Sequence, residues 1–162
     1  MTASRVQVAA PPHDFDFLWG TWDIANERLV ERLAGSDAWE RFEARGECWP
    51  ILGGAGNVDT FVPVNNPSGY QGASVRVYDP AAEQWSIYWA DNVRGQLFPP
   101  VFGRFVDGVG EFLGDDEHAG LPVLARFLWS GITVTTARWE QAFSVDGGET
   151  WETNWIMSFS RR

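Results

Sequence analysis

The chain has 162 residues, enough for one domain with one core, and its 22 Asp and Glu against 12 Lys and Arg give a formal charge of −10. This charge repels phosphate backbones and anionic membranes, so we expect neither nucleic acid nor a membrane as a partner. The single cysteine, Cys48, excludes an intrachain disulfide and a thiolate metal cluster and favours a reducing compartment.

Residues 1–12 contain no apolar run long enough for a signal peptide, and no stretch of the chain approaches the roughly 18 apolar residues of a membrane span. We therefore expect a flexible N-terminal segment over 1–12 and a single domain over 13–162. The same observations predict a soluble, cytoplasmic protein.

The domain consists of short apolar-polar segments separated by turn residues. A short helix is predicted over 13–19, and alternation then predicts strands at 22–30, 39–49, 60–64, 72–78, 84–92, 101–106, 109–113, 123–129, 132–143 and 151–160. About nine or ten strands at this spacing indicate an all-β fold, an up-and-down antiparallel barrel with a short N-terminal helix. A closed barrel of about eight or more strands removes exposed edges and can hold one small ligand.

Two motifs carry a resemblance to a known superfamily. Gly20-Thr21-Trp22 is similar to the G-x-W of lipocalins and the wider calycin superfamily, and it ends a longer F-x-F-L-x-G-x-W over 15–22. The second motif, Y-D-P...W-x-x-Y-W-x-D over 78–91, makes the resemblance more specific. Together they resemble a bacterial family of calycin-like proteins of unknown function, and the resemblance spans nearly the whole chain in strand order.

The resemblance implies roles for residues at a closed barrel end. In calycins the glycine of G-x-W permits the entry turn and the tryptophan plugs the barrel, and the matching residues here are Gly20 and Trp22. An arginine on or just after the last strand packs across that tryptophan, for which this chain offers Arg161 and Arg162. A cation over an indole contributes on the order of 1 kcal/mol. The resemblance implies a fold and leaves the activity open.

Residues 144–151, Ser-Val-Asp-Gly-Gly-Glu-Thr-Trp, match S-x-D-x-G-x-T-W, the Asp-box of sialidase-like propellers. That box is a folding device, an Asp-Gly turn with a tryptophan packed beneath it. One copy cannot make a propeller, which needs several similar blades. We predict a hairpin here, joining the last two strands, and no catalytic role.

Candidate ligand-binding residues come from strands whose alternation groups polar side chains. In one strand of the predicted hairpin Arg138 and Glu140 share a face, and in the other Glu152 and Asn154 do, so the four can cluster across the strand pair. Alternation does not tell whether this cluster faces water or the lumen. Ten Trp and eleven Phe predict a wide core or an aromatic-lined cavity, in which a few polar groups orient a ligand. The ligand-binding candidates are Arg138, Glu140, Asn154, Tyr88, Trp89, Asp91 and Arg126.

The histidines and the cysteine favour no metal, cofactor or nucleophile. His118 ends an Asp-Asp-Glu-His run whose composition suits a metal but whose spacing does not, and we predict an exposed acidic loop there. Neither His13 nor His118 lies on a predicted strand, which argues against a haem ligand inside the barrel. Cys48 has no strand-borne histidine to activate it. We therefore expect no metal and no cofactor.

Three functions are consistent with these observations. The first is a binding module whose cavity takes a small, largely apolar molecule with one polar end. The second is a cofactor-independent enzyme of the hydratase, isomerase, cyclase or decarboxylase type, in which Glu140 or Asp91 serves as acid or base and Arg and Tyr groups stabilise negative charge. The third is a structural or regulatory protein that forms a homodimer through exposed aromatics. An enzyme needs an acid and a base in the same lumen, whereas a carrier needs one polar anchor, and the fold does not decide.

Overall fold

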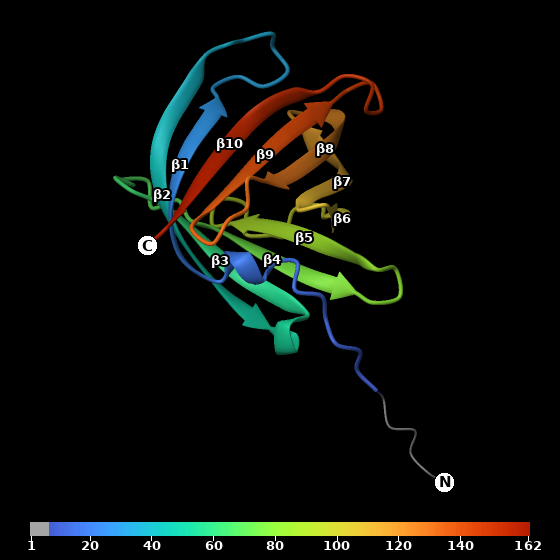
Figure 1. Ribbon diagram of the computed structural model, residues 1–162. Coiled ribbons are helices and arrows are strands. Elements are labelled where there is room, and N and C mark those ends of the chain that lie inside the picture. Colours follow the sequence, from blue (N-terminus) through green and yellow to red (C-terminus); the bar gives the residue numbers. More distant parts are fainter. Residues whose placement is uncertain (1–6) are drawn as a thin grey trace.

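The computed structural model describes residues 7–162 and is a closed barrel of ten antiparallel strands (Figure 1). Each strand pairs with its neighbours in sequence, and the first pairs with the last to close the circle. The strands are β1 (Gly20–Leu29), β2 (Trp39–Ile51), β3 (Gly56–Pro63), β4 (Gly72–Asp79), β5 (Gln84–Asp91), β6 (Val101–Val106), β7 (Val109–His118), β8 (Leu121–Ser130), β9 (Thr136–Ser144) and β10 (Glu152–Arg161). The predicted all-β, up-and-down barrel is confirmed.

Helix is confined to two 3-10 turns in the described part of the chain, η1 (Asp16–Leu18) and η2 (Leu52–Gly54). The predicted N-terminal helix over 13–19 is therefore present as the single turn η1. Of the predicted N-terminal segment over 1–12, residues 1–6 lie outside the described residues, and 7–12 form neither helix nor strand.

Alternation along each strand sorts side chains between the lumen and the outer surface. In β1 Trp22, Ile24 and Asn26 are buried, each two residues from the next. A slip of one residue would bring Asp23 and Glu27 into the core, so this pattern fixes the pairing register. In β10 the register with β9 shifts between Thr153 and Trp155, which marks a bulge at that point.

Strand β7 runs through the segment that the sequence predicts as an exposed acidic loop. Residues 115–118 continue the strand and pair with β8, with Asp115 opposite Leu124 and His118 opposite Leu121. The loop prediction is wrong because the ladder to β8 satisfies the backbone N–H and carbonyl groups, and this outweighs the poor strand propensity of acidic residues. His118 therefore lies on a strand.

The hairpin between β9 and β10 is the predicted Asp-box turn. Asp146 accepts hydrogen bonds from the hydroxyl and the backbone N–H of Thr150 and from the Ser144 hydroxyl, and these bonds hold the pKa of its carboxyl well below its usual range. The Trp151 indole donates to the carbonyl oxygen of Gly148 at 3.1 Å. These contacts explain the motif as a structural turn.

One end of the barrel is closed by η1 and the residues before it. Phe15 and Leu18 are buried, and the Trp22 indole N–H donates to the carbonyl oxygen of Leu18 at 2.7 Å. Phe15 packs edge-on against Trp85 of β5, with ring centroids 5.0 Å apart. We call η1 and its two flanking residues, Phe15 and Trp19, the plug.

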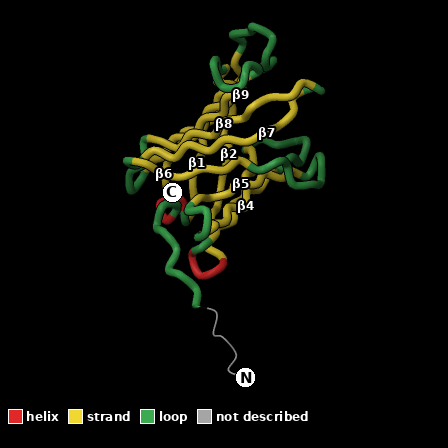
Figure 2. The backbone as a smooth tube through the Cα atoms, turned by 90° about the vertical axis from the view of Figure 1, so that its right-hand side faces the viewer, coloured by secondary structure: helices red, strands yellow, loops and turns green. Residues whose placement is uncertain are grey.

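Arg161, at the end of β10, ties the plug to the barrel. Its guanidinium carbon lies 4.2 Å from the Trp22 ring centroid. Its nitrogens donate to the carbonyl oxygens of Phe17, Trp19 and Val134 at 2.6, 2.7 and 2.9 Å. Figure 2 shows the C-terminus beside the first short helix, as these bonds require. Of the two candidate arginines, Arg161 is the one that packs on Trp22.

Gly20 is the residue that lets this contact form. Its φ is +111°, a conformation that other residues rarely adopt, and a Cβ there would lie 2.8 Å from Nη1 of Arg161. The glycine between Trp19 and Trp22 therefore supplies both the turn into β1 and the space for the guanidinium.

Replacing Arg161 with alanine should lower the free energy of unfolding by about 2 kcal/mol, because three charge-assisted hydrogen bonds and one cation–π contact are lost from a solvent-accessible site. Urea denaturation followed by circular dichroism measures this loss. Arg162→Ala is the matched control, since it removes a 3.4 Å ion pair between the Arg162 side chain and the exposed Asp23 and should cost less than about 0.5 kcal/mol. Equal losses for the two variants would contradict the assigned role of Arg161.

Candidate functional site

The barrel interior holds a cavity of about 300 Å³. Because inward positions repeat every second residue along each strand, all ten strands contribute residues to the cavity wall. Its wall is mainly aromatic. The aromatic rings that line it are Trp22, Phe61, Tyr70, Trp89, Phe98, Phe127, Trp129, Trp139, Phe143, Trp155 and Phe159.

Three tryptophans from different strands form the middle of the wall. The rings of Trp139 and Trp155 lie 5.8 Å apart and those of Trp89 and Trp155 lie 6.5 Å apart, all edge-to-face. The Trp155 indole N–H donates to the buried Asn26 amide at 3.0 Å, which fixes its orientation. Gly72 of β4 leaves room for Trp89, because a Cβ there would lie 2.2 Å from that indole. The wall is thus a set of fixed apolar surfaces.

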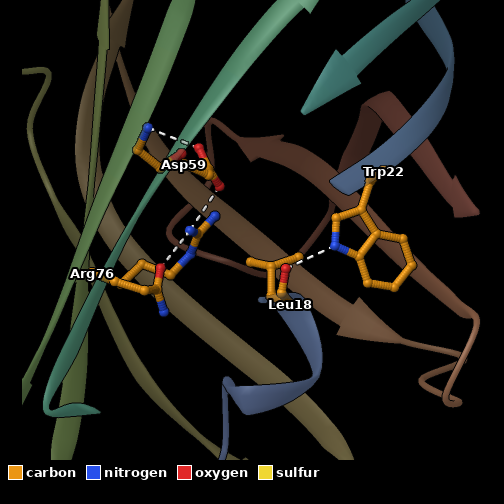
Figure 3. A network of polar contacts seen from close by, with 6 residues as sticks. Leu18, Trp22, Asp59 and Arg76 are labelled. Atoms are coloured by element: carbon orange, nitrogen blue, oxygen red, sulfur yellow. Dashed lines mark hydrogen bonds and ion pairs between the residues drawn. The ribbon is translucent and has the colours of Figure 1, made fainter. Parts of the chain in front are cut away.

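The floor of the cavity, next to the plug, carries a buried polar group of three side chains. Arg76 of β4 contacts Asp59 of β3 at 2.7 Å and donates to the Asn57 amide oxygen at 2.9 Å. Asp59 also accepts the backbone N–H of Ser74 at 2.9 Å. Figure 3 shows Arg76 and Asp59 turned toward each other, near Leu18 of the plug. The floor is polar, and its charges compensate each other.

The mouth of the cavity lies at the opposite end. Strand β1 begins at the plug, so Arg28 near its other end lies at the far rim, and Arg32 follows in the next loop. Arg28 donates to one carboxylate oxygen of Glu40 from Nε at 2.7 Å and from Nη2 at 2.6 Å. The Arg28 guanidinium also lies 5.0 Å from the Trp155 ring centroid.

The other side of the mouth is formed by the loops on either side of the β4–β5 hairpin. Burial raises the pKa of the Tyr70 hydroxyl, and the nearby Asp91 raises it further. Asp91 uses one carboxylate oxygen to accept the backbone N–H groups of Val93 and Arg94 at 3.0 and 2.8 Å. Tyr70 therefore presents a neutral hydroxyl at neutral pH, and Asp91 keeps a second oxygen free of these turn contacts.

The structure brings only part of the predicted site set to the cavity. Trp89 and Asp91 line it. Tyr88 lies on the opposite face of β5, and Arg126 of β8 lies over the ring of Trp151 at 4.4 Å. Neither of these two lines the cavity, and their assignment to a ligand stays a prediction.

The predicted cluster on β9 and β10 also lies away from the cavity. Arg138 and Glu140 are partly exposed and contact each other at 3.3 Å. Their neighbours in sequence, Trp139 and Gln141, point to the other face of β9 and line the cavity. The alternation of β9 places its bulky aromatic face inside because burying aromatic surface is favourable and burying an ion pair is costly. Asn154 is fully buried, accepts a hydrogen bond from Gln141 at 2.8 Å, and does not line the cavity itself.

Several cavity residues were missed or left unassigned in the sequence. Arg28 continues the two-residue alternation of Trp22, Ile24 and Asn26, so this alternation would have predicted an inward side chain for it. Arg32 and Tyr70 come from loops, where no period applies, and no sequence signal points to them.

Among residues 7–162, no group of three or more His, Cys, Asp or Glu side chains is arranged to hold a metal ion. Within the same range, no helix has the length and apolar character needed to span a bilayer. His118 lines the cavity near its mouth, with its ring 5.7 Å from that of Phe143.

Comparison with known proteins supports the fold. No family model matches the chain, and no curated protein matches it. Among solved structures, an S-type phycobiliprotein lyase, CPES, from Guillardia theta is similar, with a TM-score of 0.57 and 10% sequence identity over 91% of this chain and 90% of that one. At this identity the likeness shows the fold alone, a closed antiparallel β-barrel.

Cys48 lines the cavity as a protonated thiol, because burial raises its pKa to about 12. At pH 8 roughly one thiol in ten thousand is then ionised, against about a quarter of free cysteines. We expect iodoacetamide to alkylate native Cys48 at least a hundredfold more slowly than the urea-unfolded chain, with a rate that still rises up to about pH 10. Mass spectrometry of timed samples measures this rate, and a plateau near pH 9 would contradict the raised pKa.

Proposed function

We propose that this protein binds a small, largely apolar molecule with a polar end in the lumen of its barrel. The observation that carries the proposal is the cavity of about 300 Å³, aromatic along its middle and polar at its floor and mouth. This size is at the lower end of the range for small-molecule sites, and apolar walls with a few placed polar groups are typical of them.

The wall favours a flat or aromatic ligand body. Trp89, Trp139 and Trp155 present ring faces and edges from three strands, and stacked or edge-to-face contacts with a ligand ring add to the effect of area burial. The hydrogen bond from Trp155 to Asn26 keeps its indole in place before a ligand arrives, which lowers the ordering cost of binding. The plug closes the other end, so we expect the ligand to enter through the mouth.

The likeness to a phycobiliprotein lyase supports a small-molecule partner in general terms. It does not identify the molecule. The chain contains no lysine, since all 12 of its basic residues other than histidine are arginines, so a Schiff base to a lysine side chain is excluded as a way to hold an aldehyde ligand.

Three groups that an enzyme could use as a base or a nucleophile are poorly suited to that role, which favours binding over the alternative of a cofactor-independent enzyme. Both oxygens of Asp59 are engaged, one by Arg76 and one by the Ser74 backbone, which leaves a poor general base. Cys48 is held as a thiol and is a weak nucleophile. Glu140, one of the two predicted acid–base residues, does not line the cavity. A cytoplasmic location and a homodimer stay predictions.

The neutral fluorophore N-phenyl-1-naphthylamine, whose emission increases in apolar surroundings, should bind with one site per chain. Trp89→Leu removes one ring from the wall and should weaken this binding about two- to tenfold, the value of one aromatic contact. Fluorescence titration with direct excitation of the probe measures the affinity.

Trp49→Leu is the matched control, because Trp49 is 42% exposed and does not line the cavity, and it should leave the affinity within a factor of two. Unchanged melting temperatures would show that both variants fold. Absence of probe binding to the unmodified protein, or an equal effect of the two substitutions, would refute binding in the lumen.

A further inference from the structure

Arg32 stands in the loop between β1 and β2, at the mouth of the cavity, half-buried. Its guanidinium carbon lies 5.8 Å from the ring centroid of Trp155, the tryptophan that Arg28 also approaches. Its Nε is buried and has no hydrogen-bond partner, and no carboxylate of the described residues lies within 4 Å of its guanidinium. Arg32 is therefore a charged side chain without a counter-ion at the entrance to an apolar lumen.

The carboxylates nearest to Arg32 are engaged by other donors. Glu40 receives both contacts from Arg28. Glu152 accepts the backbone N–H of Leu33 with both oxygens, at 2.8 and 3.1 Å. Arg28 contacts only one oxygen of Glu40, but neither carboxylate lies within 4 Å of the Arg32 guanidinium in the described part of the chain.

The surroundings of Arg32 disfavour its charge. Burial lowers its pKa, and the neighbouring Arg28 lowers it further, while Glu40, Glu152 and Tyr70 offset part of this effect. A guanidinium stays protonated at neutral pH, so the cost remains as unfavourable desolvation and like-charge repulsion. An anion placed between the two guanidiniums relieves both.

We propose that Arg32 binds an acidic group of the ligand, such as a carboxylate, whose apolar body lies against Trp155 in the lumen. The inference rests on the proposed function and names the chemical class of the ligand: a small aromatic or apolar organic acid. The planar guanidinium can present two parallel N–H groups to such an acid. The Trp155 ring lies against the face of the guanidinium, so the edge of the guanidinium stays available for these bonds.

The loop holds Arg32 ready for this contact. Leu33 has a φ of +59°, an unfavourable conformation for a leucine, and the Glu152 carboxylate retains it there through the Leu33 N–H. Leu33 also packs against the core. Glu152 thus acts as a positioning residue, because the loop conformation it fixes determines where Arg32 lies.

The other arginines of the cavity are less suited to this role. Arg28 and Arg76 have carboxylate partners in Glu40 and Asp59. Arg94 lies on an exposed loop beside Phe98, where water solvates its charge. Arg32 combines partial burial with the lack of a partner.

A matched pair of probes isolates the acidic group. The fluorophore 1-anilinonaphthalene-8-sulfonate has the aromatic frame of N-phenyl-1-naphthylamine with one sulfonate added. Arg32→Gln should weaken binding of the sulfonate about tenfold or more, the loss expected for a charge-assisted hydrogen bond, and change the affinity for the neutral probe less than twofold. Fluorescence titration of both probes on each variant gives the two ratios.

Arg45→Gln is the control, because it removes the same charge from the outer face of β2, where Arg45 is 59% exposed and 3.9 Å from Asp23. It should change neither affinity more than twofold. The sulfonate should also displace the neutral probe completely, as one shared site requires.

The outcomes separate the two claims. If neither probe binds the unmodified protein, the proposed function fails, and the anion site fails with it. If the neutral probe binds but Arg32→Gln weakens both probes equally, or neither, the anion site is refuted and lumen binding stands. Failure of the sulfonate to displace the neutral probe places the anion elsewhere and also refutes the site.

Discussion

The guanidinium of Arg161 lies over the Trp22 indole and binds the carbonyl oxygens of Phe17 and Trp19, so the last strand anchors the plug that precedes the first. This contact joins the plug to the end of β10, where β1 and β10 pair to close the barrel. The plug seals one end of the lumen, and the mouth lies at the opposite end. In the binding that we propose, a ligand enters through the mouth, with its leading end toward the floor and its trailing end among the side chains of the rim.

The two polar ends of the lumen differ in how their charges are balanced. At the floor, Arg76 is compensated by Asp59, an arrangement that avoids an isolated buried charge and leaves little to gain from an ionic ligand. At the mouth, Arg32 lacks such a partner among residues 7–162. Between them the tryptophan wall offers only apolar contacts. This gradient favours an amphipathic ligand and gives it a direction: apolar body inward, acidic group at the rim.

Much of the fold followed from local sequence pattern, and much of the site did not. Alternation and turn residues predicted about nine or ten strands, and the G-x-W resemblance led to Gly20, Trp22 and a choice between Arg161 and Arg162. The inward face of β9 could not be chosen, because one face carries Arg138 and Glu140 and the other Trp139, and only packing in the closed barrel decides between them. Loop residues such as Arg32 reach the mouth through tertiary contacts that no period encodes.

Location of a ligand in the lumen is the central claim, and indole N–H signals in nuclear magnetic resonance test it most directly. Of the ten tryptophans, Trp22, Trp89, Trp129, Trp139 and Trp155 line the cavity, whereas Trp19, Trp39, Trp49, Trp85 and Trp151 do not. In a protein labelled with nitrogen-15, addition of N-phenyl-1-naphthylamine should shift signals of the first group, those of Trp89, Trp139 and Trp155 most, and leave Trp49 and Trp151 in place. Shifts confined to the second group would place the ligand on the outer surface and contradict the account.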